Sequence, residues 1–139
     1  MVPVSSNMIE KGQEKLHRIL VVDDEPRILR FVRLNLCSCG FEVITASDGD
    51  DALSIINSEK PDLMILDIFM PGLDGFGVLK KLREREDNIG CPHLPVIVFS
   101  ARSAVCSKAM NLGADDFIAK PFQPEEMAEK IRKTITHIS

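Results

Sequence analysis

Five short apolar runs recur along the chain, and each is followed by a stretch with apolar residues at helical spacing. The runs are too short for ordinary buried helices and end at turn-forming residues, so we interpret them as strands. The predicted strands cover residues 18–22, 41–46, 63–66, 95–99 and 116–119. Strands that alternate with helices predict a parallel sheet, with right-handed crossovers and helices on both faces.

The intervening stretches predict five helices, each with one apolar stripe. The stripe residues are Ile28, Leu29, Val32 and Leu36; Ala52, Ile55 and Ile56; Val78, Leu79 and Leu82; Val105, Ala109 and Leu112; and Met127, Ile131 and Ile135. The third helix is predicted from Gly75 to about Arg85, with the charged residues 83–87 as a solvated end. Residues 1–16 are polar and aperiodic, so we expect a flexible N-terminal arm, with a short extra helix as the alternative, before a single domain of residues 17–139.

Composition narrows the class of protein. A chain of 139 residues with 45% hydrophobic residues is large enough for one domain with a proper core. Its net charge of -4 argues against direct nucleic-acid binding by this segment. No apolar stretch approaches the roughly 18 residues of a membrane span, and the N-terminus has no signal core. The four cysteines form no CxxC pair, so we expect reduced thiols in a cytoplasmic protein.

Polar residues stand where the predicted strands end. Asp23 and Asp24 follow the first strand, Asp67 the third, Ser100 the fourth and Lys120 the fifth. Asp24 alone is explained as a helix cap and Asp67 alone as a turn residue, whereas Asp23 has no such local explanation. In an open parallel sheet, ligands bind at the carboxyl ends of the strands where the strand order reverses. With the flavodoxin-like order 2-1-3-4-5, taken from the fold class, these five residues share one edge of a three-layer α/β sandwich.

That combination of side chains indicates a particular chemistry. Three crowded carboxylates repel one another and raise one another's pKa values, and a hard divalent cation removes the repulsion. Magnesium suits a site with few carboxylates and a phosphate to complete its octahedron. Lys120 adds a second positive charge and Ser100 a hydrogen-bond donor. Together they indicate phosphoryl transfer onto Asp67.

These residues resemble the receiver domain of two-component response regulators. The matching pieces are residues 21–25 (Val-Val-Asp-Asp-Glu), 67–72 (Asp-Ile-Phe-Met-Pro-Gly), 74–75 (Asp-Gly), 100–101 (Ser-Ala) and 113–122 (Gly-Ala-Asp-Asp-Phe-Ile-Ala-Lys-Pro-Phe). They occur in the family's order and at compatible spacing from about Arg18 to the C-terminus. Several motifs in register are far more specific than one short motif.

The resemblance implies a role for each matching position. Asp67 would accept a phosphoryl group from a sensor histidine kinase. Mg²⁺ would be bound directly by Asp24, Asp67 and the backbone carbonyl of Phe69, and mainly through water by Asp23. The module would catalyse only its own phosphorylation and dephosphorylation.

Further positions carry the switch that the resemblance implies. Lys120 would pair with the phosphoryl group, and Ser100 would hydrogen-bond to it and draw Phe117 inward. The Lys120–Pro121 bond would be cis. Phe117 has no hydroxyl where many relatives carry Tyr, so switching would rest on packing. Phe69 and Arg102 occupy variable positions that tune the phosphate lifetime.

The effector that this receiver domain would control is inferred by analogy with other members of the family. The C-terminal part of the chain is similar to regulators with a winged-helix DNA-binding domain, and the alternative is a stand-alone single-domain regulator. In such relatives the face of helix four, strand five and helix five forms a two-fold dimer on activation. Asp116 and Lys130 are expected to pair across that interface. Glu126 is expected to pair with Lys108, because Cys106 stands where relatives commonly carry a basic residue.

Two other classes fit the pattern less well. A phosphatase with an aspartate nucleophile needs a second carboxylate two residues later, where this chain has Phe69. A flavodoxin-like redox module needs a hydroxyl- or glycine-rich phosphate loop after the first strand. The acidic residues 23–25 would repel a phosphate there.

Overall fold

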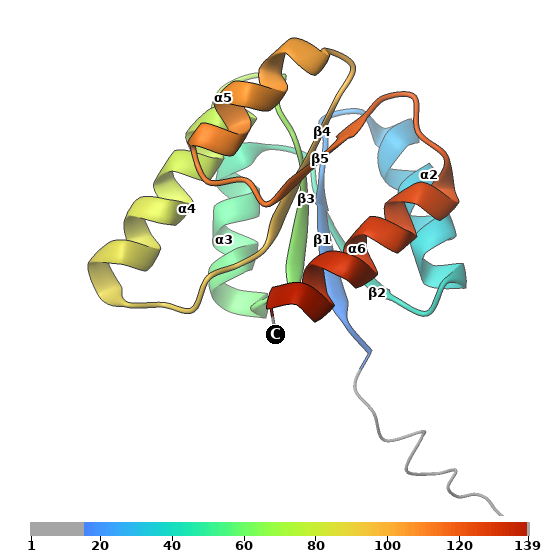
Figure 1. Ribbon diagram of the computed structural model, residues 1–139, viewed down its shortest axis with the longest axis horizontal. Coiled ribbons are helices and arrows are strands. Elements are labelled where there is room, and N and C mark those ends of the chain that lie inside the picture. The colour runs from blue at the N-terminus through green and yellow to red at the C-terminus, as the bar shows by residue number, and fades with distance from the viewer. Residues whose placement is uncertain (1–15, 139) are drawn as a thin grey trace, which may run out of the picture.

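The computed structural model describes residues 16–138, and the predicted N-terminal arm therefore lies outside the described residues except for Leu16. Five strands and the helices between them follow one another along the chain (Figure 1). The strands are β1 (Arg18–Val22), β2 (Glu42–Ala46), β3 (Leu63–Asp67), β4 (Val96–Ser100) and β5 (Asp116–Ala119). The α-helices are α2 (Pro26–Ser38), α3 (Gly49–Glu59), α4 (Gly75–Ile89), α5 (Cys106–Asn111) and α6 (Pro124–Ile138), and a 3-10 turn, η1 (Ser103–Val105), precedes α5.

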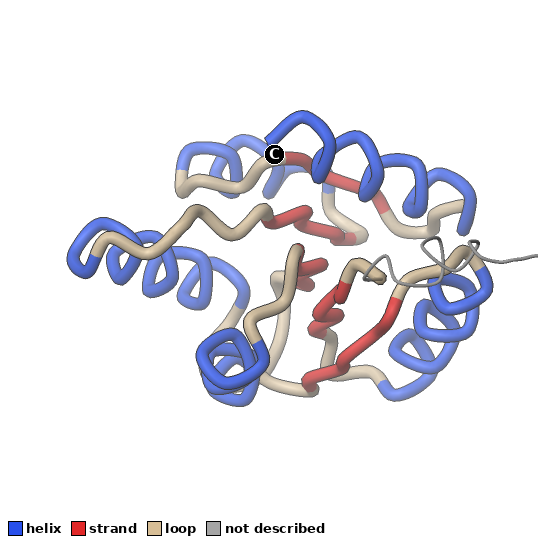
Figure 2. Tube along the Cα trace, turned by 90° about the horizontal axis from the view of Figure 1, so that it is seen from below, coloured by secondary structure: helices blue, strands red, loops and turns tan. Residues whose placement is uncertain are grey.

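The strands form one parallel sheet in the order β2-β1-β3-β4-β5, as predicted. Helices α2 and α6 cover one face, and α3, α4 and α5 cover the other, so the domain has three layers (Figures 1 and 2). Strand order reverses between β1 and β3, which are hydrogen-bonded neighbours. The carboxyl ends of these two strands define the crevice in which ligands bind in sheets of this type.

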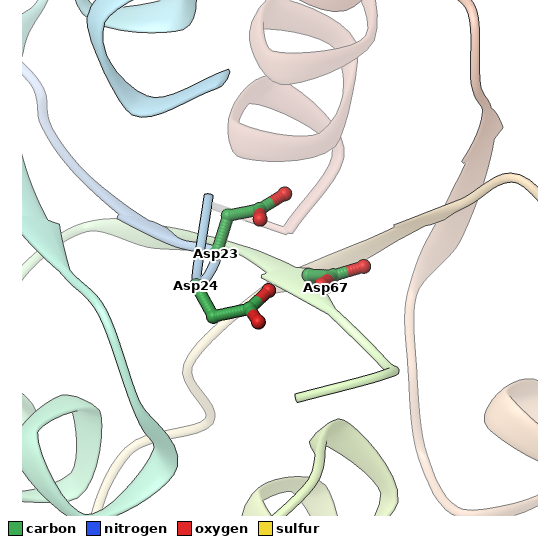
Figure 3. A group of neighbouring side chains, drawn as sticks. All are labelled: Asp23, Asp24 and Asp67. Carbon is green, nitrogen blue, oxygen red and sulfur yellow. The ribbon is translucent and has the colours of Figure 1, made fainter. Parts of the chain in front are cut away.

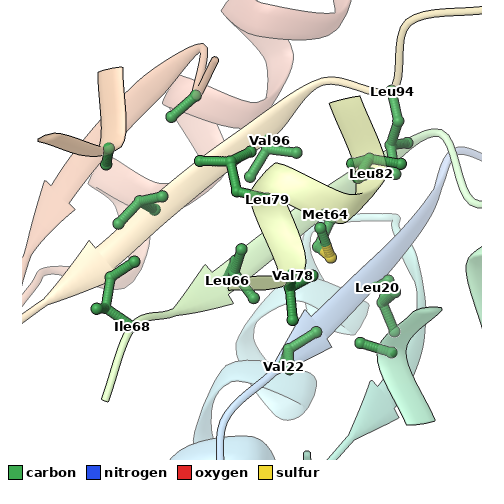
Figure 4. Packing of buried hydrophobic residues seen from close by; sticks show 14 of the residues in the cluster. Leu20, Val22, Met64, Leu66, Ile68, Val78, Leu79, Leu82, Leu94 and Val96 are labelled. Carbon is green, nitrogen blue, oxygen red and sulfur yellow. The ribbon is translucent and has the colours of Figure 1, made fainter. Parts of the chain in front are cut away.

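Two apolar clusters fill the spaces between the layers. Leu20, Val22, Met64 and Leu66 point toward α3 and α4, where they pack against residues such as Val78 (Figure 4). The alternate residues of the same strands pack against α2 and α6. Because β1, β3 and β4 are buried on both faces, their sequences are continuous apolar runs rather than alternating ones.

The prediction for the end of the third helix was wrong. Helix α4 runs on to Ile89 and ends at Gly90, whose φ of 71° suits a left-handed cap. Arg83 and Glu86 are not a solvated face, since their side chains are only 14% and 10% exposed. The Arg83 guanidinium pairs with Glu86 and also with Asp115. Glu86 lies one turn further along the same helix and Asp115 lies just before β5, so these contacts hold α4 against the domain beyond the point at which its apolar stripe ends.

The other element boundaries differ only slightly from the predictions. The fourth helix begins with the single 3-10 turn η1 before α5. No helix among residues 16–138 is both long and apolar enough to cross a bilayer.

Candidate functional site

Three carboxylates converge at the carboxyl ends of β1 and β3. Val22 pairs with Leu66 in the sheet, which places Asp23 and Asp67, the next residues of the two strands, side by side. One carboxylate oxygen from each of Asp23, Asp24 and Asp67 lies within 4.8 Å of the others (Figure 3). This is the constellation expected from the strand ends.

Lys120 closes the cluster from the end of β5. Its Nζ lies 2.9 Å from Asp23 Oδ2 and 3.3 Å from Asp67 Oδ1. The backbone N–H of Lys120 donates to the carbonyl of Ser100, and the Lys120–Pro121 peptide bond is cis. The lysine therefore stands at the same edge as the acidic cluster, with its ammonium between two carboxylates.

Burial makes the electrostatics of this cluster unusual. Asp23 is 1% exposed and Asp67 5% exposed, whereas Asp24 is open to solvent. Burial, helped by the charge of Asp23, raises the pKa of Asp67 to about 6 against the lowering effect of Lys120. Burial of the ammonium is the largest single effect on Lys120 and acts downward. The hydrogen bond to Asp23 and the nearby carboxylate charges still hold its pKa above the ordinary value.

Asp23 has a local role that its sequence position did not reveal. Its Oδ1 accepts a hydrogen bond from the backbone N–H of Glu25 at 2.9 Å, which orders the turn into α2. The interpretation of Asp24 as a helix cap fails, because the cap position of α2 is Glu25, which makes no side-chain capping bond. The Asp24 carboxylate is thus left to face the cluster.

The remaining predicted residues line the rim or the adjoining face. Ser100 is fully buried, and its hydroxyl accepts a hydrogen bond from Arg102 N at 3.2 Å. The Arg102 guanidinium lies 4.7 Å from the centre of the half-exposed Phe69 ring. Phe117 packs against the apolar cluster on the α4 side of the sheet.

Three of the four residues predicted for the dimer face, Asp116, Lys130 and Lys108, have side-chain partners within this chain. Lys130 Nζ lies 3.3 Å from Asp116 Oδ1 and donates to the Phe117 carbonyl at 2.8 Å. The Lys108 ammonium lies 4.3 Å from the centre of the Phe76 ring on α4. A symmetric interface would have to exchange these contacts for intermolecular ones.

Sequence reasoning missed one aromatic contact of the site. Phe99, fully buried on β4, lies beneath Lys120, whose Nζ is 4.5 Å from the ring centre. In the sequence Phe99 is one more apolar residue of a buried strand, and no pattern distinguishes it from Val96 or Val98. Only the fold places its ring beside the lysine.

The donor set fits a small hard cation. All three side chains offer carboxylate oxygens, the ligands that Mg²⁺ takes in proteins, and their mutual distances suit a single ion. The cluster contains neither histidine nor cysteine, the ligands typical of zinc sites. A parallel α/β sandwich with these groups at its switch point has the composition of a phosphoryl-transfer site.

Comparison with known proteins gives the family. Residues 19–132 match the model of the response regulator receiver domain. The chain belongs to this family and is a signalling module of two-component systems.

Two of the similar curated proteins are named as transcriptional regulators. The chain is 42% identical over 125 residues to the probable transcriptional regulator ycf27 of Porphyra purpurea, with 88% of this chain and 49% of that protein covered. It is 41% identical over 117 residues to the alkaline phosphatase synthesis transcriptional regulatory protein PhoP of Bacillus subtilis, with 83% and 47% covered. The chain therefore spans about half the length of the curated relatives it matches.

Solved structures agree with the fold. The receiver domain of NtrX from Brucella abortus superposes with a TM-score of 0.76 at 35% identity, covering 85% of this chain and 98% of that one. The chemotaxis protein CheY4 of Vibrio cholerae superposes with a TM-score of 0.78 at 27% identity, covering 86% and 99%.

Proposed function

We propose that Asp67 is the phosphoacceptor of this receiver domain and takes its phosphoryl group from a sensor histidine kinase. The observation that carries the proposal is the buried Asp67 carboxylate, held 3.3 Å from the Lys120 ammonium and within reach of two further carboxylates. An oxygen of Asp67 would bond to phosphorus while the bond from phosphorus to the kinase histidine breaks, its electron pair returning to the imidazole. The chain itself would turn over no external substrate.

Asp24, Asp67 and the Phe69 carbonyl would hold Mg²⁺ directly, and Asp23 mainly through water. The ion would supply positive charge for the incoming phosphoryl oxygens. Lys120 would follow the new negative charge, since its ammonium already lies between Asp23 and Asp67.

The buried hydroxyl of Ser100 would turn to donate to a phosphoryl oxygen. Its present contact is a backbone N–H from Arg102, for which the hydroxyl acts only as acceptor, so its proton stays available. Phe117 would follow Ser100 inward, and the α5–β5–α6 face would change shape. Phe117 lacks a hydroxyl, so packing alone would carry this movement.

The domain would serve as the N-terminal part of a cytoplasmic DNA-binding regulator. The support is the naming of the relatives as transcriptional regulators and their greater length. A stand-alone single-domain regulator is the alternative, and the reading frame beyond Ser139 separates the two.

Phosphorylation by a small donor tests the acceptor. With acetyl phosphate and Mg²⁺, intact-mass spectrometry should show one added phosphoryl group on the wild-type chain and none on Asp67→Asn. Asp87→Asn, an exposed carboxylate near the far end of α4, is the matched control and should be labelled normally. Label retained in Asp67→Asn would reject the assignment.

A second test concerns a phosphorylation-dependent homodimer through the α5–β5–α6 face. Asp116 and Lys130 would exchange their internal pair for two symmetric intermolecular pairs, and Glu126 and Lys108 would add two more. With beryllofluoride, sedimentation should detect a weak dimer, because exposed ion pairs contribute only about 0–1 kcal/mol each. Lys130→Glu should abolish it, addition of Asp116→Arg should restore it, and Lys133→Glu, an exposed control on the same helix, should leave it intact. A monomer at every concentration would exclude this interface.

A further inference from the structure

The ammonium of Lys120 has an aromatic neighbour as well as two carboxylates. Its Nζ lies 4.5 Å from the centre of the Phe99 ring, within the range of a cation–π contact. Asp67 and Phe99 are register partners on adjacent parallel strands, so their side chains leave the same face of the sheet. The lysine therefore reaches over an aromatic ring to a carboxylate that lies beside that ring.

We propose that Phe99 is a positioning residue for Lys120. The ring of Phe99 holds the Lys120 ammonium beside Asp67. This inference rests on the proposed function of Asp67 as phosphoacceptor. The face of an aromatic ring carries partial negative charge and attracts a cation, most strongly where water is excluded. Phe99 is fully buried and the Lys120 side chain is only 19% exposed, so the contact meets that condition.

The ring has a property that the carboxylate partners of Lys120 lack. A metal ion at the acidic cluster would compete with the ammonium for the carboxylate oxygens of Asp23 and Asp67, and phosphorylation would convert the Asp67 carboxylate into an acyl phosphate. Both events would change the ion pairs that now hold the ammonium, because the metal ion would take up carboxylate oxygens and the phosphoryl group would bring negative charge at a new position. The ring of Phe99 binds no metal and is not modified, so its attraction persists through the reaction.

A second ring fixes the orientation of the first. The ring centroids of Phe99 and Phe122 are 6.1 Å apart at an interplanar angle of 78°, an edge-to-face contact. Phe122 is packed in turn against Phe31 of α2, with the ring centroids 6.0 Å apart. Phe122 thereby keeps the face of Phe99 turned toward the ammonium.

The test distinguishes the effect of the charged face of the ring from the effect of side-chain volume. Phe99→Leu keeps an apolar side chain but removes the charged ring face. Incorporation of 3,4,5-trifluorophenylalanine at position 99 keeps the ring shape and weakens its negative face. The matched control is Phe41→Leu, which shortens another buried phenylalanine of the same apolar cluster, just before β2 at the opposite edge of the sheet.

The first readout needs neither metal nor phosphoryl donor. In lysine-labelled protein, NMR should show the methylene protons beside the Lys120 ammonium shifted upfield by the ring of Phe99. The upfield shift should be lost in Phe99→Leu and kept in Phe41→Leu.

The second readout is the rate at which Asp67 takes up a phosphoryl group from acetyl phosphate in the presence of Mg²⁺. It should fall roughly 2- to 30-fold in Phe99→Leu, the range that loss of one cation–π contact implies, and by less in the trifluoro variant. Phe41→Leu should react at the wild-type rate. Equal rates in Phe99→Leu and Phe41→Leu, or Lys120 shifts unaffected by Phe99→Leu, would overturn the inference. Absence of uptake by the wild-type protein would instead count against the proposed function, while the shifts would still decide where the ammonium lies.

Discussion

Replacing Asp67 by Asn should stabilise the metal-free fold at neutral pH. Burial raises the pKa of the Asp67 carboxyl from an ordinary 3.8 to about 6, so the folded state resists ionisation of this group. At about 1.4 kcal/mol per pKa unit, the difference corresponds to about 3 kcal/mol. Asparagine has nearly the shape of the protonated carboxyl and no proton to lose, and it therefore removes this cost.

The sign of the pH dependence follows from proton counting. Below pH 3.8 the carboxyl is protonated in both the folded and the unfolded state, and the group contributes no difference. Between pH 3.8 and about 6 only the unfolded state loses the proton, so wild-type stability falls as the pH rises. Above about pH 6 the Asp67 carboxyl is ionised in both the folded and the unfolded state, and the full free-energy cost of its burial persists. The advantage of Asp67→Asn should grow from about 1 kcal/mol at pH 4.5 to about 3 kcal/mol at pH 7.5.

Urea unfolding followed by circular dichroism, in EDTA at both pH values, measures this advantage. Asp87→Asn removes an exposed carboxylate and should match the wild-type curve at each pH. An advantage that is independent of pH, or an Asp67→Asn protein less stable than wild type at pH 7.5, would refute the reasoning from burial.

Three further predictions concern the metal and the scaffold. Magnesium should raise the unfolding free energy of the wild-type protein by about 2.7 kcal/mol when the ion is present at a hundred times its Kd for the site. The increase should be much smaller for Asp67→Asn, and thermal melts with and without the ion measure the difference. Gly75→Ala should destabilise by about 1–3 kcal/mol or more, because a Cβ there would lie 2.4 Å from the Asp67 backbone carbonyl. Gly77→Ala on the same helix meets no backbone atom closely: its Cβ would approach the flexible end of the Leu73 side chain and lie at ordinary contact distance from the Asp74 side chain. It should be nearly neutral in urea unfolding, and equal losses at both glycines would contradict this argument. Arg83→Met should lower the unfolding free energy by about 2–4 kcal/mol, because the largely buried Asp115 carboxylate loses its guanidinium partner; a loss below about 1 kcal/mol in the same assay would show that the pair contributes little.

Much of the fold could be predicted from local patterns. A strand covered on both faces must be apolar along its length, and a helix packed on one side must carry a stripe, so the two kinds of element differ visibly in sequence. The order of the strands came from the fold class, and the sheet has that order. The acidic cluster was predictable for a related reason. Parallel strands bring their carboxyl ends to one edge. Asp67 is the last residue of β3, and Asp23 and Lys120 directly follow β1 and β5.

Tertiary packing decided which partner each side chain meets. Arg83 pairs with Glu86 one turn along α4 and with Asp115, which lies 32 residues further along the chain, beyond the end of the apolar stripe of α4. Lys130 reaches Asp116 within its own chain, whereas the family resemblance had implied a partner on a second copy of the activated domain. Phe99 lies under Lys120 because two strand ends and a turn converge there. Periodicity records that a side chain is buried or exposed. It does not record the neighbour, because that contact depends on how distant elements pack, and no local pattern carries the information.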